Sequence, residues 1–332
     1  MGIRRYTQTT FTQGEVGSFI KGRAELGIYR AGLETCENMI LLPQGGIDRR
    51  RGFKFISANL ESSTLADGST DVTTGSFHTQ SRLSILAACE DPKTISTYSY
   101  AGQVWPLPQT GQMWLEYELL SKPEAKGFFC VSTSYRNEPN PVPGRHDKIF
   151  PMFEFEMKGS MEEMKKMEEE LLDHLGFNKF YPSGTYPEGD YVDVAEKYGT
   201  KELEHEHEEK LRQDHGPVFF LKHFPNFSSP FWNMKQAENS SVDGGHAKKI
   251  DVIINGIETI GSAQRSTDPE EMRKQFYNIS DGAYANILFS NFTKERVERE
   301  LDEFLSFNFF ERSGGGIGLT RLIKVMKESD LL

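Results

Sequence analysis

Large apolar residues alternate with polar ones in several short stretches of this chain, and these stretches predict strands. The apolar run Gly127–Val131 precedes a loop with three prolines, and the chain then returns as FPMFEFEM, where large apolar residues alternate with Glu154 and Glu156. A period of two is typical of a strand with two different faces. We therefore expect two antiparallel strands joined by a long charged loop.

A second hairpin is predicted over Lys248–Arg265. Its sequence, KKIDVIINGIETIGSAQR, reads as a strand, a turn at Asn255-Gly256 and a second strand, because Asn-Gly favours the tight turns that join antiparallel strands. The short apolar run Pro217–Leu221 predicts a further, buried strand.

Spacings of three and four residues predict helices elsewhere. The clearest amphipathic helix lies within Met157–Leu175, with Ser160 as its cap and Gly176 as its stop. Other helical regions are expected from near Gly111 to Leu120, over Val192–Gln213 with an interruption at Tyr198-Gly199, and after Gly318. In the run EHEHEE (204–209), helical spacing points His205 and His207 to different faces, which favours a solvated acidic face over a metal cluster.

The first 75 residues have a different character. We expect a short helix over Ala31–Asn38, a strand in MILLP (39–43) and another in GFKFI (52–56). Residues Ser57–Gly75 are rich in Ser, Thr, Gly and Asp, which is typical of a linker. We therefore divide the chain into an N-terminal segment (1–56), a linker (57–75) and a main domain (76–332).

Composition limits the classes of function. The 332 residues carry a net charge of −11, which disfavours broad, nonspecific binding to nucleic acids. The three cysteines are far apart and indicate neither a disulfide framework nor a zinc site, so we expect a reducing cytoplasm. No apolar span is long enough for a membrane helix, and the N-terminus shows no apolar signal core.

Three stretches carry residues suited to binding a nucleotide. Arg136, Glu138, Arg145 and His146 cluster at the charged loop, and arginine presents a planar fork of donors that matches phosphate oxygens. Asp251 and Glu258 face each other across the second hairpin, within reach of one Mg²⁺. The glycine run 314–316 and Gly318 precede a helix, where the backbone favours phosphate. A solvated loop, a surface hairpin with ordinary charges and a simple glycine run are the alternatives for each stretch taken alone.

Two resemblances to known families are visible. FTQGEVG, LETCENM and LLPQGGIDRRRGFKF, within residues 10–56, resemble the opening of a family of bacteriophage virion proteins, which implies a viral genome and no catalytic role for this segment. SYRNE…RHDKIFPMFEFE and GGGIGLTRL resemble motifs 2 and 3 of class II aminoacyl-tRNA synthetases. TGQMWLE and DVIINGIETIGSAQR resemble the aspartyl/asparaginyl branch of that family, in the same order and at similar spacing.

The second resemblance implies an α+β fold, an antiparallel sheet flanked by helices, and an ATP-dependent ligase that forms an aminoacyl-adenylate. It implies that Arg136 contacts the α-phosphate and the amino-acid carboxylate and that Arg145 and His146 contact the outer phosphates. Adenine would lie between Phe150 and Arg321, with Glu138 on its amino group. It further implies that Asp251 and Glu258 bind Mg²⁺ and that Gln112 and Arg265 bind the amino acid. At Gly316 and Gly318 it implies that ATP approaches the backbone closely.

The family forms homodimers through its motif 1, which we do not find upstream of Phe77. No anticodon-binding barrel is recognised before the core, as in the asparagine synthetases of this branch, which transfer aspartyl-adenylate to ammonia. We therefore expect an asparagine-synthetase-like ligase. Leu115 lies where aspartate-specific enzymes tend to carry lysine, which favours the alternative, an asparaginyl-tRNA synthetase-like ligase with tRNA as acceptor. An inactive virion-associated protein, in the cytoplasm of a phage-infected host, is the alternative from another class.

Overall fold

One central β-sheet organises the molecule. The computed structural model describes residues 53–55, 63–64, 70–71, 84–100, 102–139, 141, 147–238 and 244–332. Within these residues the sheet has eight strands in the order β1-β6-β7-β12-β11-β10-β9-β8. The strands are β1 (Phe53–Phe55), β6 (Gly127–Tyr135), β7 (Ile149–Lys158), β8 (Glu188–Asp190), β9 (Val218–Pro225), β10 (His246–Ile254), β11 (Ile257–Gln264) and β12 (Arg312–Gly318).

The strands from β6 to β9 pair antiparallel, as predicted, whereas the two outermost strands pair parallel. β6 pairs with β7, β7 with β12, β12 with β11, β11 with β10 and β10 with β9, all antiparallel. β1 joins β6 and β8 joins β9 in parallel. Two small antiparallel hairpins lie outside this sheet, β2 (Ser63–Thr64) with β3 (Thr70–Asp71) and β4 (Thr97–Tyr100) with β5 (Gln103–Pro106).

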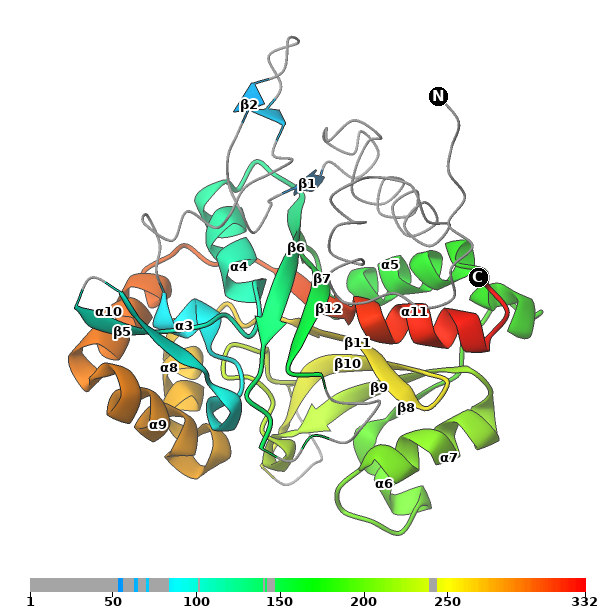
Figure 1. Cartoon of the computed structure of the whole chain (residues 1–332). Helices are drawn as coiled ribbons and strands as arrows, with labels where there is room; N and C mark the ends of the chain where they lie inside the picture. Colours follow the sequence, from blue (N-terminus) through cyan, green and yellow to red (C-terminus); the bar gives the residue numbers. More distant parts are fainter. Residues whose placement is uncertain are drawn as a thin grey trace.

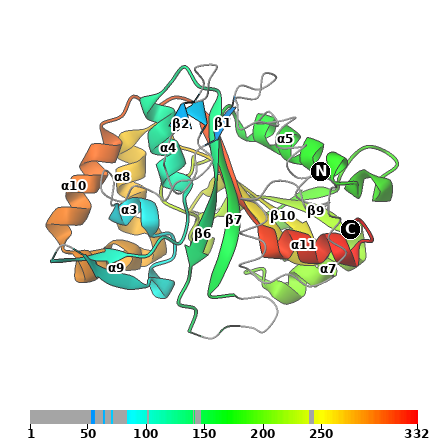
Figure 2. The same ribbon diagram turned by 45° about the horizontal axis from the view of Figure 1, so that its top comes forward.

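Helices cover the two faces of the sheet in separate groups, as Figures 1 and 2 show. One face carries α5 (Met161–His174) and α11 (Leu319–Glu328). The other group contains α3 (Ile85–Ala88), α4 (Gln112–Ser121), α8 (Pro269–Asn278), α9 (Ala283–Phe292) and α10 (Lys294–Leu305). α6 (Tyr191–Lys197) and α7 (His205–His215) pack against β9. Short 3-10 turns occur at Pro92–Thr94, Phe177–Phe180, Asn226–Ser228 and Ile279–Gly282.

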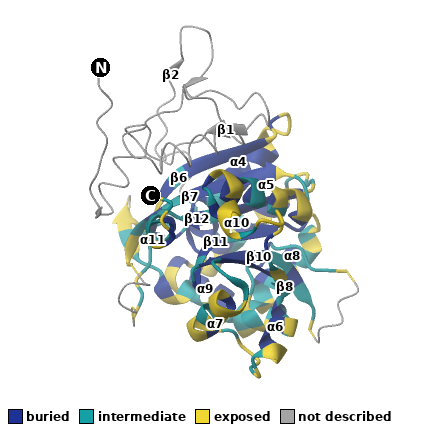
Figure 3. Ribbon diagram, turned by 90° about the vertical axis from the view of Figure 1, so that its right-hand side faces the viewer, coloured by how far each residue is buried: buried dark blue, intermediate teal, exposed yellow. Residues whose placement is uncertain are grey.

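The two groups of helices build two different cores. α5 and α11 pack on strand residues, so that Phe155, Val252 and Ile260 meet methionines and leucines of these helices. The core of α3, α4, α8, α9 and α10 consists mainly of helix residues and loop aromatics around the fully buried Trp232. Figure 3 shows the strands mostly buried, while exposed segments lie on the outer helices. The second group meets the sheet through α4, whose Leu115 and Leu119 pack with Phe128 and Cys130 of β6.

Helix α5 confirms the amphipathic prediction in detail. Met161, Met164 and Met167 are buried against the sheet. Ser160 and Glu163 form a reciprocal capping box that satisfies backbone donors at the helix start, an arrangement that stabilises a helix by about 1 kcal/mol. Gly176 then adopts a left-handed conformation, with φ of 92°, and ends the helix.

The predicted hairpins are confirmed, and the glycine run has a structure of its own. β10 and β11 turn at Asn255 and Gly256, which have φ of 49° and 72°. Residues 312–318, which contain the glycine run, form β12 in the middle of the sheet. The region 192–213 contains two helices, α6 and α7, which are separated after Tyr198. His205 is exposed and His207 is buried, so they do point to different faces.

Most predictions for the first 75 residues lie outside the described residues. These include the helix at 31–38, the strand at 39–43 and the virion-like segment, apart from β1, which lies in the predicted strand GFKFI. None of the helices in the described part of the chain has the length and apolar character needed to span a membrane.

Candidate active site

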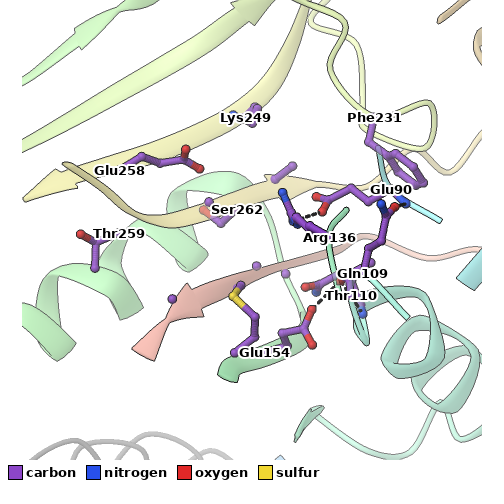
Figure 4. A pocket seen from close by; sticks show the side chains of 18 of the residues that line it. Glu90, Gln109, Thr110, Arg136, Glu154, Phe231, Lys249, Glu258, Thr259 and Ser262 are labelled. Atoms are coloured by element: carbon purple, nitrogen blue, oxygen red, sulfur yellow. Dashed lines mark hydrogen bonds and ion pairs between the residues drawn. The ribbon is translucent and has the colours of Figure 1, made fainter. Parts of the chain in front are cut away.

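A cavity of about 420 Å³ lies over the centre of the sheet, and it brings together residues from distant parts of the chain. Most of the predicted site residues line it: Gln112, Arg136, Glu138, Phe150, Glu258, Arg265, Gly316, Gly318 and Arg321. Figure 4 shows side chains converging on it from several strands and from the segment before α4. Arg145 and His146 lie outside the described residues, and their roles remain predictions.

The floor of the cavity is the glycine strand β12. A Cβ on Gly314 would overlap a carboxylate oxygen of Glu156 and lie 2.5 Å from the carbonyl oxygen of Phe155. A Cβ on Gly315 would lie 2.6 Å from the carbonyl oxygen of Gly261. Glycine weakens an isolated strand, but a strand without side chains allows neighbouring groups to approach its backbone. The run therefore provides the space that the cavity occupies.

One end of the cavity, which we call the paired end, holds buried charges of both signs. It consists of Gln112, Glu116 and Arg265, which line the cavity, and of Glu156 and Arg312, which pair with Arg265 and Glu116 but are not among the lining residues. Both carboxylates and Arg312 are fully buried, and the Arg265 side chain is 5% exposed. The guanidinium of Arg312 donates to Oε2 of Glu116 at 2.7 and 3.1 Å. Buried ions are tolerated when they are paired and hydrogen-bonded in this way.

Arg265 and Glu156 form the second pair of the paired end. Arg265 Nη2 lies 3.2 Å from Glu156 Oε2 and 3.3 Å from the carbonyl oxygen of Gly314. Gln112, the first residue of α4, donates from Nε2 to the same Glu156 oxygen at 2.8 Å and to the carbonyl oxygen of Phe155 at 2.7 Å. Burial raises the pKa of Glu156 to about 7, although the charge of Arg265 lowers it.

Glu154 adds a carboxylate beside the paired end. It is fully buried and accepts hydrogen bonds from the hydroxyls of Ser132 and Thr110 and from the backbone N–H of Gly111 at 2.8 Å. Burial raises the pKa of Glu154 despite these bonds. Glu154 therefore ties β6 and β7 to the start of α4, and Figure 4 shows it on the side of Thr110.

A second group, which we call the open end, consists of Arg136, Lys249, Glu258 and Arg321, which line the cavity, and of Asp251, which is not among the lining residues. Its cations are more accessible, since the side chains of Arg136 and Arg321 are 33% and 35% exposed. Arg321, in the first turn of α11, donates to the carbonyl oxygen of Glu258 at 2.7 Å and lies 3.7 Å from its carboxylate. Two arginines and a lysine around one opening favour an anionic ligand.

Arg136 makes two contacts that bear on its predicted role. Its guanidinium forms an ion pair with Glu90 and lies 5.7 Å from the centroid of the Phe150 ring. Glu90 is held by the buried Gln109, whose Oε1 accepts from the backbone N–H groups of Glu90 and Asp91 at 2.7 and 2.9 Å. Figure 4 shows Glu90, Arg136 and Gln109 on the same side of the cavity. Sequence reasoning did not identify Glu90.

Asp251 and Glu258 fit the predicted cation site in part. Asp251 is buried, and its Oδ1 has no hydrogen-bond partner among the described residues. A Cβ placed on Gly261 would lie 3.4 Å from this oxygen and 3.1 Å from Oε1 of Glu258, so both oxygens face the same space. No group of three or more His, Cys, Asp or Glu side chains suited to a metal occurs in the described ranges. A Mg²⁺ here would therefore rely on oxygens of a substrate as well.

Several residues in and beside the cavity were not predicted from the sequence. Glu116 and Arg312 lie in a helix and a strand where nothing in the local pattern marks a charge as buried. The signal for Glu154 and Glu156 was present, because the alternation of the predicted strand puts both on the face opposite Phe153 and Phe155. The polarity of that face was noted, but its burial was not expected.

Comparisons with known proteins identify the family of this chain. The family model for tRNA synthetases class II (D, K and N) matches residues 83–331. The asparaginyl-tRNA synthetase of Pyrococcus horikoshii, solved with asparaginyl-adenylate, is similar with a TM-score of 0.60 and 18% identity, over 90% of this chain and 65% of that one. The asparaginyl-tRNA synthetase of Entamoeba histolytica with asparaginyl-adenylate gives 0.57 and 18%, over 72% and 57%. The aspartyl-tRNA synthetase of the same organism gives 0.52 and 19%, over 66% and 48%.

No curated protein matches the sequence. The chain spans between about half and two-thirds of the length of the solved structures named above. The family model covers well over half of the chain. The chain therefore belongs to the class II tRNA synthetases of the D, K and N group.

Proposed function

We propose that this protein is an ATP-dependent ligase that activates asparagine or aspartate as an aminoacyl-adenylate. The observation that carries the proposal is that Arg136, Arg265 and Arg321, from three distant segments, line one cavity with Glu258. Family membership supports it, and two of the similar structures contain asparaginyl-adenylate. The paired end would hold the amino acid and the open end the phosphates.

The reaction needs the carboxylate to be positioned and the charge of the phosphates to be neutralised more than it needs a dedicated base. An oxygen of the amino-acid carboxylate attacks the α-phosphorus of ATP, the bond from that phosphorus to the bridging oxygen breaks, and pyrophosphate leaves. Arg136 would neutralise the α-phosphate and hold the carboxylate, and Arg321 would contact the γ-phosphate. Glu258 and Asp251 would hold Mg²⁺, which supplies charge neutralisation to the phosphate oxygens when bound.

Adenine would lie near the outer part of the cavity. Phe150 and Arg321 would contact its two faces, since aromatic rings and guanidinium groups both stack on a purine. Glu138 would accept from its amino group. The contact between Arg136 and Phe150 leaves the other face of the ring for the base. Gly316 and Gly318 would allow the nucleotide to approach the backbone.

The charges of the paired end favour asparagine over aspartate. Glu116 and Glu156 neutralise Arg312 and Arg265, and Glu154 adds a further buried carboxylate. The carboxylate of an aspartate side chain would meet no uncompensated cation, whereas an amide can donate to a carboxylate and accept from Arg265. Leu115 is fully buried among apolar residues, so no lysine at that position supplies the missing charge.

The transfer to ammonia is the second candidate. It starts from aspartate and would require a neutral Glu156, whose pKa is raised by burial although the charge of Arg265 lowers it. A neutral Glu156 would leave the charge of Arg265 available for the side-chain carboxylate of aspartate. Asparagine as the substrate favours tRNA as the acceptor, because asparagine is itself the product of the transfer to ammonia.

ATP–pyrophosphate exchange tests the proposal. We expect exchange that depends on asparagine, weaker exchange with aspartate and none with other amino acids. R321M is the inactive control, and K324M, which removes an exposed charge from the same helix, is the matched control. The adenylate formed is then offered ammonia or tRNA. If no amino acid supports exchange, the proposal is overturned and the virion-associated alternative remains.

A further inference from the structure

Lys249 is a charged residue of the cavity to which the family resemblance assigned no role. It lies in β10, two residues before Asp251, and its side chain is 20% exposed. Its Nζ lies 2.5 Å from Oδ2 of Asp251 and 3.7 Å from the centroid of the Phe224 ring. Figure 4 shows Lys249 and Glu258 on neighbouring strands, with Glu90 and Phe231 on the other side of Arg136. The lysine therefore belongs to the open end.

The ammonium group is held in place from two sides. Phe224, in the adjacent strand β9, presents its ring face, and a cation over such a face is attracted to it. Asp251 accepts one hydrogen bond, while an ammonium group has three donors. The position of this charge is thus fixed before any ligand binds.

Asp251 uses its two oxygens differently. Oδ2 accepts from Lys249, whereas Oδ1 has no partner among the described residues and faces Glu258 Oε1 across the space above Gly261. A divalent cation between Asp251 and Glu258 would therefore use an oxygen that Lys249 leaves free. The lysine and a cation can be present together, one on each oxygen of the same carboxylate.

We propose that Lys249 binds the outer phosphates of the nucleotide directly, as a fixed cation that acts beside Mg²⁺. The inference rests on the proposed function. It follows from the position of the ammonium group, which lines the cavity at the end where Arg321 and Glu258 lie. A lysine ammonium is a compact point charge suited to phosphate oxygens. The competing explanation is that Lys249 serves only to balance the buried charge of Asp251.

Calorimetric titration of the full chain separates the two explanations. ATP, AMP and inorganic pyrophosphate are titrated in EDTA and again in Mg²⁺. We expect K249M to weaken ATP and pyrophosphate about tenfold in EDTA, the effect of losing a charged hydrogen bond, and to leave AMP unchanged. K249R should retain most of the affinity. K248M removes the same charge from the adjacent residue of β10, which does not line the cavity, and should have no effect.

The outcomes are distinguishable. Equal loss for ATP and AMP, or loss in Mg²⁺ but none in EDTA, would overturn the inference in favour of a role confined to Asp251. If K249M does not fold, the double variant K249M/D251N is compared with D251N, and the inference requires that the double variant bind ATP more weakly in EDTA. Failure of the unaltered protein to bind ATP would instead overturn the proposed function.

Discussion

The two ends of the cavity hold their charges in different ways. At the paired end, Glu116, Glu156, Arg265 and Arg312 are almost completely buried and matched in number. At the open end, the side chains of Arg136, Glu258 and Arg321 are between 33% and 42% exposed. A buried, matched set of charges fixes one geometry, because removal of one ion leaves its partner buried without a counter-charge. The cations of the open end also have carboxylate partners, but Arg136 and Arg321 are partly exposed, so a ligand can reach them. We infer that the paired end sets specificity and the open end drives the chemistry.

The largest expected effect is on stability, at the paired end. R312M would leave Glu116 buried without its cation, and we expect a loss of about 3–5 kcal/mol in the free energy of unfolding. R321M, at the open end, should change it by less than about 0.5 kcal/mol. Urea unfolding measures both. Equal losses would contradict the division between the ends.

Activity should show the reverse order. We expect R321M to lower the rate of ATP–pyrophosphate exchange by about a hundredfold or more, because a guanidinium on the phosphates would be lost. K324M should exchange at the unaltered rate. A near-normal rate for R321M would show that the open end does not contact the nucleotide during the reaction.

A buried acid of α5, outside the paired end, should also make the stability depend on pH. Glu168 of α5 is fully buried, and burial raises its pKa to about 8; the nearby hydroxyl of Ser262 lowers this pKa, and the charge of Asp251 raises it further. Because the pKa is raised in the folded state, the protonated form is favoured and its contribution to stability is lost as the pH rises toward 8.

The variant E168Q should remove this dependence. We expect the unfolding free energy of the unaltered protein, relative to E168Q, to fall by about 2–4 kcal/mol between pH 5 and 8. Urea unfolding at several pH values measures the difference. A difference that stays constant over this range would mean that Glu168 does not titrate there.

The smallest expected effect concerns the floor between the ends. G314A places a methyl group against Glu156 and the carbonyl oxygen of Phe155, and we expect a loss of about 1–3 kcal/mol and a higher KM for the amino acid. G318A is the control for stability alone, because its Cβ would make only an ordinary contact, 3.5 Å from Arg321. Equal losses of stability in the two variants would show that the strands around β12 shift to accommodate the methyl group.

Sequence reasoning predicted much of the fold where periodicity is strong. The hairpins at β6–β7 and β10–β11 and the helix α5 are confirmed, and so is the family. The strand β12 was not predicted, because glycines carry no strand signal and the reason for them lies in neighbouring strands. The strand β1 lies in the predicted strand GFKFI, whereas β8 was not predicted, because its three residues are too few for a periodic pattern.

The candidate site was predicted better at the open end than at the paired end. Arg136, Glu258 and Arg321 stand in recognisable motifs, and all three line the cavity. Glu116 and Arg312 escaped notice because their pairing joins residues 196 positions apart, which no local pattern records. The homodimer and the roles of Arg145 and His146 remain predictions.

The glycine strand also limits how this protein can change over generations. Side chains at Gly314, Gly315 and Gly316 would all meet close neighbours, so we expect single substitutions there to destabilise the protein. A lineage that acquires a different amino-acid preference must therefore change the walls around the strand, beginning with Gln112 and Glu154. Surveys of natural variants should find diversity in those walls and almost none at Gly314, Gly315 and Gly316.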